Sequence, residues 1–189
     1  MNRTGGTMRI LGIDPGSSAT GYGVVEFTGG KLQHVAHGVL RARRGEALAN
    51  RLSAIHAGLL AVIDEHGADI AVVERVFVAS NPRSALVLGH ARGAALAALA
   101  ASGLEVAELS AREVKKAVAG TGAAGKAQVQ DMVVRLLELD ARPPTDAADA
   151  LAVAICQAHA GRLAGLGVSR RRRSLRTSLA ASRLLGEKS

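Results

Sequence analysis

The chain has very few of the residues that cross-link a protein or add bulk to its core. Its 189 residues include one cysteine, no tryptophan and only 2% aromatic side chains. A single cysteine excludes an internal disulfide, and Cys156 lies in an apolar segment where a small buried hydrophobe is its simplest role. Because hydrophobic residues still make up 48% of the chain, the core must consist mainly of alanine, valine, leucine and isoleucine.

Targeting and membrane-spanning signals are also missing from the sequence. Residues 1–7 are short and polar, unlike a secretion signal, and every apolar stretch of spanning length is interrupted by charged or turn residues. We therefore expect a cytoplasmic protein with no membrane partner. The length suits one domain with a sizeable core and is too short for two large domains.

Negative charge is scarce at one end of the chain. Residues 169–189 contain six arginines and one lysine against one glutamate, a net charge of +6, whereas residues 1–168 carry 17 basic and 15 acidic side chains. A basic tail of this kind binds polyanions through counterion release. The alternative is a solvated, disordered terminus, and composition does not separate the two.

Apolar periodicity predicts ten elements in the order βββαβαβααα. Strands are expected over 8–14, 20–27, 31–40, 70–74 and 104–109, and helices over 47–66, 84–101, 110–118, 126–139 and 145–162. The pair Gly29 and Gly30 makes a tight turn, so the first three strands form an antiparallel meander. The later strands reach the sheet through helical crossovers, which gives a mixed α/β domain.

Four acidic residues stand at the ends of these predicted elements. Asp14 and Glu74 each close an apolar strand, while Asp146 and Asp149 open the apolar helix that follows Pro143 and Pro144. Residues three apart share one face of a helix, so both aspartates can point at the same place. If the strands that end in Asp14 and Glu74 are neighbours, four carboxylates gather at the edge of the core. Such a gathering is costly without cations.

Carboxylate oxygens favour Mg²⁺, or Mn²⁺ in its place. Two such ions about 3.5–4 Å apart activate a water and stabilise the leaving oxygen of a phosphodiester displacement. No histidine–cysteine cluster competes with this choice, and we assign no site to any of the six histidines. Each acid also has an ordinary explanation: a turn residue at Asp14, a strand-end charge at Glu74, a helix-dipole acid at Asp146 and an arginine partner at Asp149.

The segments around these acids resemble those of the RuvC-type Holliday junction resolvases. The similar blocks, in chain order, are Ile10-Leu11-Gly12-Ile13-Asp14-Pro15-Gly16 with Thr20-Gly21-Tyr22-Gly23, then Glu74-Arg75-Val76-Phe77 with Leu88-Gly89-His90-Ala91-Arg92-Gly93, then Val114-Lys115-Lys116 with Lys126 and Gln128-Val129-Gln130, and Asp146-Ala147-Ala148-Asp149-Ala150-Leu151-Ala152. The resemblance covers residues 8–160 without large gaps. Sugar kinases and actin-like ATPases share a strand that ends in Asp-x-Gly, so the order of four blocks carries the resemblance.

The resemblance implies an RNase H-like fold, a homodimer and Mg²⁺-dependent nicking of two strands of like polarity in a four-way DNA junction. It implies two ions per subunit during catalysis, held by the four acids, and association with the RuvA–RuvB branch-migration complex. It places Lys115 and Lys126 near the scissile phosphate, and Phe77 against an unpaired base. We also expect Arg83 to contact DNA. The alternatives are solvated lysines and a phenylalanine in the core.

The resemblance divides the chain into a disordered extension over 1–7, a nuclease domain over 8–165 and a basic tail over 166–189.

Three other functions are alternatives to junction cleavage. An actin-like or sugar-kinase-like ATPase needs a second lobe, for which this chain has no room. A pure DNA-binding module gains nothing from four carboxylates facing phosphates. An RNase H-like nuclease that acts on RNA or hybrids is the nearest alternative, because 2′-hydroxyl discrimination depends on groove contacts.

Overall fold

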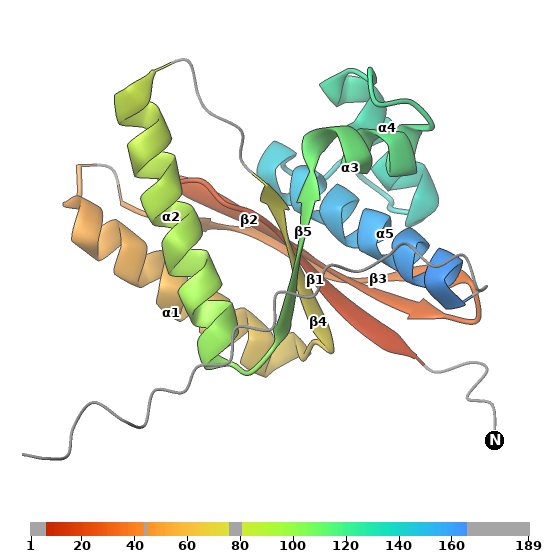
Figure 1. Ribbon diagram of the computed structural model, residues 1–189, viewed down its shortest axis with the longest axis horizontal. Coiled ribbons are helices and arrows are strands. Elements are labelled where there is room, and N and C mark those ends of the chain that lie inside the picture. Colours follow the sequence, from red (N-terminus) through yellow and green to blue (C-terminus); the bar gives the residue numbers. More distant parts are fainter. Residues whose placement is uncertain (1–6, 44, 76–80, 166–189) are drawn as a thin grey trace, which may run out of the picture.

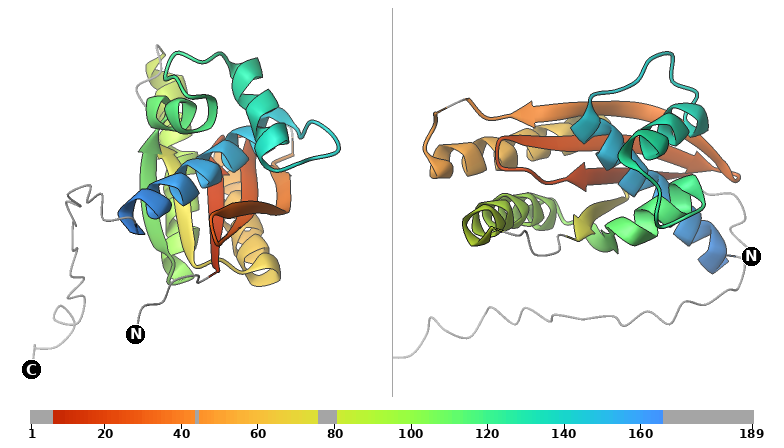
Figure 2. Two further views of the ribbon diagram at one scale, coloured as in Figure 1. Left: turned by 90° about the vertical axis from the view of Figure 1, so that its right-hand side faces the viewer. Right: turned by 90° about the horizontal axis from the view of Figure 1, so that it is seen from above.

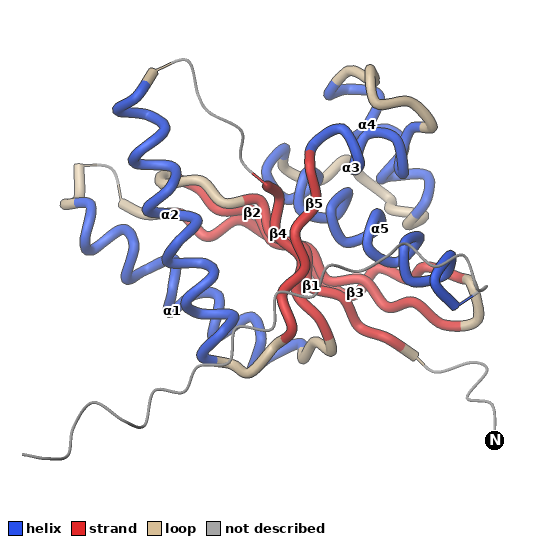
Figure 3. The backbone as a smooth tube through the Cα atoms, viewed as in Figure 1, coloured by secondary structure: helices blue, strands red, loops and turns tan. Residues whose placement is uncertain are grey.

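The computed structural model describes residues 7–43, 45–75 and 81–165, and its centre is one five-stranded sheet. The strands are β1 (Met8–Asp14), β2 (Ala19–Thr28), β3 (Lys31–Arg41), β4 (Ile70–Arg75) and β5 (Glu105–Ser110), in the spatial order β3-β2-β1-β4-β5. The pairs β1–β2 and β2–β3 are antiparallel, whereas β4 runs parallel to β1 and β5 runs parallel to β4. Figure 3 shows these strands as one layer between helices. The expected mixed sheet is confirmed.

Helices cover both faces of this sheet. One face carries α5 (Thr145–Gly165), flanked by α3 (Ala111–Ala119) and α4 (Lys126–Leu136), and the other carries α1 (Leu48–His66) and α2 (Pro82–Ala101). Figure 1 shows α1 and α2 on one side of the strands and α3, α4 and α5 on the other, and Figure 2 shows the same layers from two further directions. The sheet therefore separates two hydrophobic clusters, one under each set of helices.

Local sequence explains where several helices begin and end. Asn81 caps α2, because its side chain accepts hydrogen bonds from the backbone N–H groups of Arg83 and Ser84. Ser110 and Glu113 form a reciprocal capping box at the start of α3, and Gly120 ends that helix in the left-handed region with φ of 79°. These caps fix α3 directly after β5, so the helix starts at the edge of the sheet where β5 ends.

Three predicted boundaries are wrong by two or three residues, and one of them is the end of α5, which lies at Gly165 rather than at residue 162. Helix α2 starts at Pro82 rather than at residue 84, since a proline fits the first helical position. Helix α4 ends at Leu136 rather than at residue 139, because Glu138 has φ of 51° and cannot continue a right-handed helix. The expectations for residues 1–6 and 166–189 lie outside the described residues.

Helix α2 consists mainly of alanine, leucine and glycine and has few charged side chains, Arg83 and Arg92. By length and composition it is the one described helix that could cross a membrane. Of its most apolar 18-residue stretch, 22% is buried inside the fold. One such helix is weak evidence for a membrane span. Its buried side, Ala91, Ala95, Ala98 and Leu99, packs in the cluster formed with α1. The opposite side is exposed in the part of the chain that the structure describes.

Candidate active site

The acids Asp14 and Glu74 continue the row of residues that the sheet presents to α5. Side chains alternate along a strand, so Ile10, Gly12 and Asp14 share one face of β1. Residues Gly12 and Val72 are partners in the parallel β1–β4 register, which places Glu74 on the same face of the neighbouring strand. The two carboxylates therefore follow the buried positions of adjacent strands, at the edge where both strands end.

Glycines on the sheet bring α5 very close to these strand ends. A Cβ atom added at Gly21 would lie 1.9 Å from the carbonyl oxygen of Asp146, and one added at Gly12 would lie 2.1 Å from that of Ala150. Asp14 pairs with Gly21 across the β1–β2 ladder. The first turn of α5 thus rests on the backbone beside Asp14. Asp149 follows one turn later in α5.

Burial and mutual repulsion disturb the ionisation of the two strand carboxylates. Burial, together with the charges of Asp149, Glu74 and Asp146, raises the pKa of Asp14 from 3.8 to about 7, against a smaller opposing effect of Lys126. Burial and the charge of Asp149 also raise the pKa of Glu74, against Lys126 and Lys115. Each shift opposes the charged form. Asp14 is thus electrostatically coupled to all three other acids.

Two lysines from the neighbouring helices face the same group. The Nζ atom of Lys126, at the start of α4, lies 2.7 Å from Oδ2 of Asp149. That hydrogen bond raises the pKa of Lys126, so the ammonium group stays charged at neutral pH. Lys115 and Lys126 line a pocket of about 180 Å³ together with Glu74 and Asp149, and its remaining lining residues are Ala111, Val114, Val129 and Ala152. The pocket thus combines carboxylates and cations on an apolar floor.

The donor chemistry of this group fits a hard divalent cation. All four acids offer oxygen, and Asp14 carries an electrostatic strain that a nearby cation relieves. Over residues 7–43, 45–75 and 81–165, no three His, Cys, Asp or Glu side chains already form a closed metal-binding set. Mg²⁺ is commonly bound through one or two carboxylates, with waters and substrate phosphates as its other ligands. An open arrangement of this kind is compatible with such an ion.

Arg92 is a residue of the site that the sequence prediction did not assign. From the middle of α2 its Nε atom donates to the backbone carbonyl of Glu74 at 3.5 Å, and its Nη2 atom lies 2.9 Å from Oε2 of Glu108 on β5. Arg92 therefore ties α2 to the ends of β4 and β5. The available signal was a charged residue in the middle of a helix made mainly of alanine, leucine and glycine.

The other predicted DNA contacts stand apart from this pocket or lie outside the described residues. Arg83 is exposed in the first turn of α2, and its side chain does not line the pocket. Figure 1 shows that turn and the α3–α4 pair at the same end of the molecule, on either side of the end of β4. Phe77 falls in the 76–80 segment, outside the described residues, so its contact with an unpaired base stays a prediction.

Comparison with known proteins identifies the family. The family model described as crossover junction endodeoxyribonuclease RuvC matches residues 10–157. The chain belongs to the RuvC family. A RuvC of Burkholderia multivorans is 49% identical over 183 residues, which cover 95% of this chain and 100% of the relative. One from Burkholderia orbicola is 52% identical over 154 residues, or 82% of this chain and 85% of the relative.

Solved RuvC structures agree with this assignment. The chain is similar to Thermus thermophilus RuvC in complex with a Holliday junction substrate, with a TM-score of 0.79 and 34% identity over 84% of this chain and 97% of the other. A second Thermus thermophilus RuvC structure gives a TM-score of 0.75 at the same identity, over 84% of this chain and 98% of the other. The RNase H-like fold and the nuclease family expected from the sequence are confirmed.

Proposed function

We propose that this RuvC family member is a structure-selective endonuclease that resolves Holliday junctions by nicking two DNA strands of like polarity. The observation that carries the proposal is the gathering of Asp14, Glu74 and Asp149 with Lys126 at one edge of the sheet. The solved relative that was bound to a Holliday junction substrate supports the choice of DNA over RNA. In this proposal the enzyme acts in recombination and repair of DNA in the cytoplasm.

The four acids Asp14, Glu74, Asp146 and Asp149 would hold Mg²⁺, or Mn²⁺ in its place, with two ions per subunit during catalysis. When bound, such ions activate a water and stabilise the charge on the leaving oxygen. The raised pKa of Asp14 and Glu74 means that protons compete with the ions for these oxygens. Occupancy of the site should therefore increase with pH near neutrality.

Lys126 is proposed to act on the scissile phosphate. Its side chain is 60% exposed while its Nζ atom is held by Asp149, so it can exchange that partner for an incoming phosphate oxygen. A fixed cation at this place stabilises charge that develops in the transition state. Lys115, which lines the same pocket, is proposed to hold the DNA backbone. Lys115 lies on α3 and Lys126 on α4, so two separate helices supply the cations.

The homodimer is proposed to form through the uncovered face of α2. Leu86 on this face is 63% exposed, and nothing lies within 4 Å of a Cβ atom added at Gly89 or Gly93. With Ala97 and Ala100 these residues make a stripe at helical spacing, where small side chains permit close helix packing. A two-fold dimer would present two equivalent sites to the two strands of a junction.

The remaining contacts are proposed from the sequence and the family. Arg83 and Phe77 would contact DNA beside the junction centre, with Phe77 stacked on an unpaired base. Residues 8–165 would form the nuclease domain, and the basic segment 166–189 would bind DNA arms or a partner protein. Association with the RuvA–RuvB branch-migration complex belongs to the same proposal. Deletion of residues 169–189 should reduce the slope of DNA affinity against salt if this segment contacts phosphates.

Cleavage of defined substrates tests the proposed function. The full-length protein is incubated with a synthetic four-way junction, a linear duplex and an RNA–DNA hybrid of the same sequence, each with and without Mg²⁺. Paired nicks in the junction alone, and only with Mg²⁺, are expected. Preferred cleavage of the hybrid would contradict the proposal and favour an RNase H-like activity on RNA.

Two isosteric variants test the assignment of the acids. Asp14→Asn and Glu74→Gln each remove a charge while keeping the shape of the side chain. Because the metal ions contribute several kcal/mol to the transition state, the nicking rate should fall by about 10³-fold. Junction binding, measured by gel shift in Ca²⁺, should change little. A normal nicking rate in either variant would show that these acids are not the catalytic ligands.

A further inference from the structure

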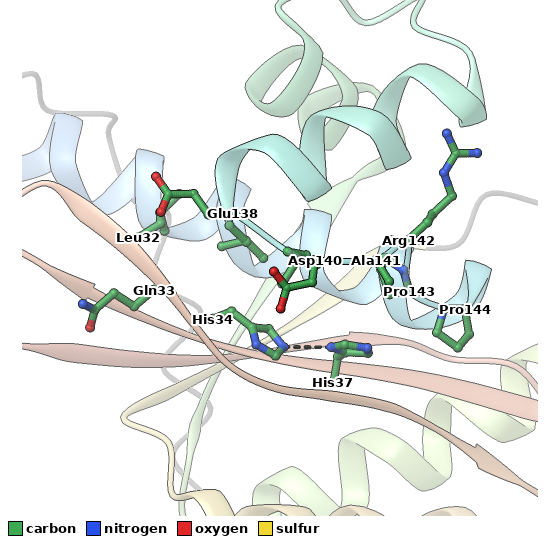
Figure 4. A pocket seen from close by; sticks show the side chains of 12 residues that line it. Leu32, Gln33, His34, His37, Glu138, Asp140, Ala141, Arg142, Pro143 and Pro144 are labelled. Atoms are coloured by element: carbon green, nitrogen blue, oxygen red, sulfur yellow. Dashed lines mark hydrogen bonds between the residues drawn. The ribbon is translucent and has the colours of Figure 1, made fainter.

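The outer edge of the sheet carries a second cluster of metal-binding side chains, remote from the acids. The edge strand β3 and the 137–144 segment between α4 and α5 enclose an open pocket of about 660 Å³. Figure 4 shows His34 and His37 side by side on β3 at the floor of this pocket. Neither histidine belongs to the proposed nuclease site.

A bulge in β3 explains why these two histidines meet. In a regular strand, residues three apart point to opposite faces of the sheet. Here Val24 pairs with Ala36 and Val25 pairs with His34, so Val35 is an extra residue in β3. The shift places His34 opposite Val25 and His37 opposite Gly23, two residues of β2 that share one face. Both imidazoles therefore point to the side of the sheet that carries α5.

The ring nitrogens of the pair lie unusually close together. Nε2 of His34 is 2.8 Å from Nδ1 of His37, and the ring centroids are 4.9 Å apart. Two lone pairs at this distance repel unless a proton or a metal cation lies between them. Burial lowers the pKa of both imidazoles, and the charge of His37 lowers that of His34 further. The pair is thus neutral at physiological pH, which is the form that binds metals.

The segment above the pair supplies an oxygen donor. Figure 4 shows Asp140 on the 137–144 segment, with its carboxylate directed down toward the histidines. Arg142 of the same segment is ion-paired with Asp131 of α4. Within the part of the chain that the structure describes, no third His, Cys, Asp or Glu already completes a metal-binding group with the pair. Asp140 therefore has to move toward the histidines to serve as a ligand.

We propose that His34 and His37, with Asp140 as the oxygen ligand, form a binding site for a transition-metal ion such as Zn²⁺. Imidazole nitrogens favour Zn²⁺, Cu²⁺ and Ni²⁺ over Mg²⁺. Two Zn–N bonds of about 2.0–2.1 Å at a tetrahedral angle separate the nitrogens by about 3.3 Å. The pair needs to open by only about half an ångström to reach this spacing. Bound metal would join the edge strand to the segment that leads into α5.

Calorimetric titration with Zn²⁺ of the full-length protein, first freed of transition metals, tests the site. Saturating Mg²⁺ and the Asp14→Asn background prevent the nuclease acids from contributing. We expect one Zn²⁺ per chain, and affinities at least about tenfold weaker in His34→Gln and His37→Gln. His56→Gln, a histidine removed from α1, is the matched control and should bind Zn²⁺ like the parent. Equal affinity in all these proteins, or no binding, would overturn the proposal.

A second measurement avoids any variant that folds poorly. In the ¹⁵N spectrum of the unmodified protein, addition of Zn²⁺ should shift the imidazole signals of two of the six histidines, assigned to His34 and His37. If the pair is only hydrogen-bonded, its signals stay unchanged and the proposal is wrong.

The variant Asp140→Asn tests the oxygen ligand by the same calorimetric titration. It should weaken Zn²⁺ binding less than either histidine variant. An unchanged affinity in that variant would remove Asp140 from the ligand set.

Discussion

The two faces of the sheet hold their helices in different ways. On the α1–α2 face, large side chains such as Leu11, Ile55 and Leu59 fill the space between strand and helix. On the α5 face, Gly12 and Gly21 let the helix backbone lie directly against the strands. The first arrangement provides apolar burial and can adjust by moving side chains. The second has no side chain between the two backbones, so it fixes the position of the helix that carries Asp146 and Asp149.

The sharpest test of this difference is the substitution Gly21→Ala. Its Cβ atom would lie 1.9 Å from the Asp146 carbonyl oxygen, so α5 has to move away from β2. A misplacement of about 1 Å at a catalytic site can cost about 10²-fold in rate, and overpacking costs about 1–3 kcal/mol of stability. Nicking assays and urea unfolding measure the two effects. A folded variant with the normal nicking rate would contradict the role of this contact.

Truncation on the opposite face should affect stability and leave the chemistry intact. Leu59 of α1 is fully buried, and Leu59→Ala leaves a cavity that costs about 2–5 kcal/mol. The free energy of unfolding should fall by that amount in urea titrations. The nicking rate per folded molecule should stay within about twofold of the parent, because none of the four candidate metal-binding acids packs against Leu59. A large loss of rate would mean that both faces set the geometry of the site.

Charge provides a further contrast between the faces, because the acids with raised pKa values lie on the side of the sheet that carries α5. The pKa of Asp14 is about 7 in the folded, metal-free protein and 3.8 as its ordinary value, so the folded state binds the extra proton between these pH values. Stability must then decrease as pH rises from about 4 to about 7, with a slope approaching 1.4 kcal/mol per pH unit. Glu74, whose pKa is also raised, adds to the decrease.

Urea titrations across this pH range in EDTA measure the slope. Asp14→Asn should reduce it, since the variant has no proton to lose, and Mg²⁺ should reduce it by binding the deprotonated carboxylates. An identical slope in the parent and in the variant would show that Asp14 does not titrate in this range.

The smallest effect is expected for Gly58→Ala in α1. The added Cβ atom would meet only the end of the Leu40 side chain, at 3.0 Å. Alanine is favoured over glycine inside a helix by about 1 kcal/mol, which should offset the tight contact. The net change in unfolding free energy should stay below about 1 kcal/mol. This variant is the matched control for Gly21→Ala, because both add one methyl group next to the sheet.

Local patterns were sufficient to predict the ten elements and the acids, but not the contacts that join them. The apolar runs before Asp14 and Glu74 predicted two strands that end in acids. Nothing in the sequence indicated that Gly21 would lie under the Asp146 carbonyl, because helix-to-strand distance depends on packing between distant segments. The bond from Arg92 to the Glu74 backbone is of the same long-range kind.

The histidine pair shows a second reason for such misses. Residues His34 and His37 are three apart in a strand, a spacing that predicts opposite faces. Only the extra residue Val35 reverses this expectation, and a bulge depends on register with the neighbouring strand. The end of α4 was missed similarly, because Glu138 adopts a backbone conformation that is uncommon for its residue type.

The glycine contacts have a consequence for how variation can accumulate in this enzyme. Most of the interior is aliphatic, and aliphatic residues of similar volume can replace one another with little cost. Positions 12 and 21 admit no side chain at all without a shift of the backbone. Amino-acid substitutions should therefore be tolerated at many interior positions but not at positions 12 and 21.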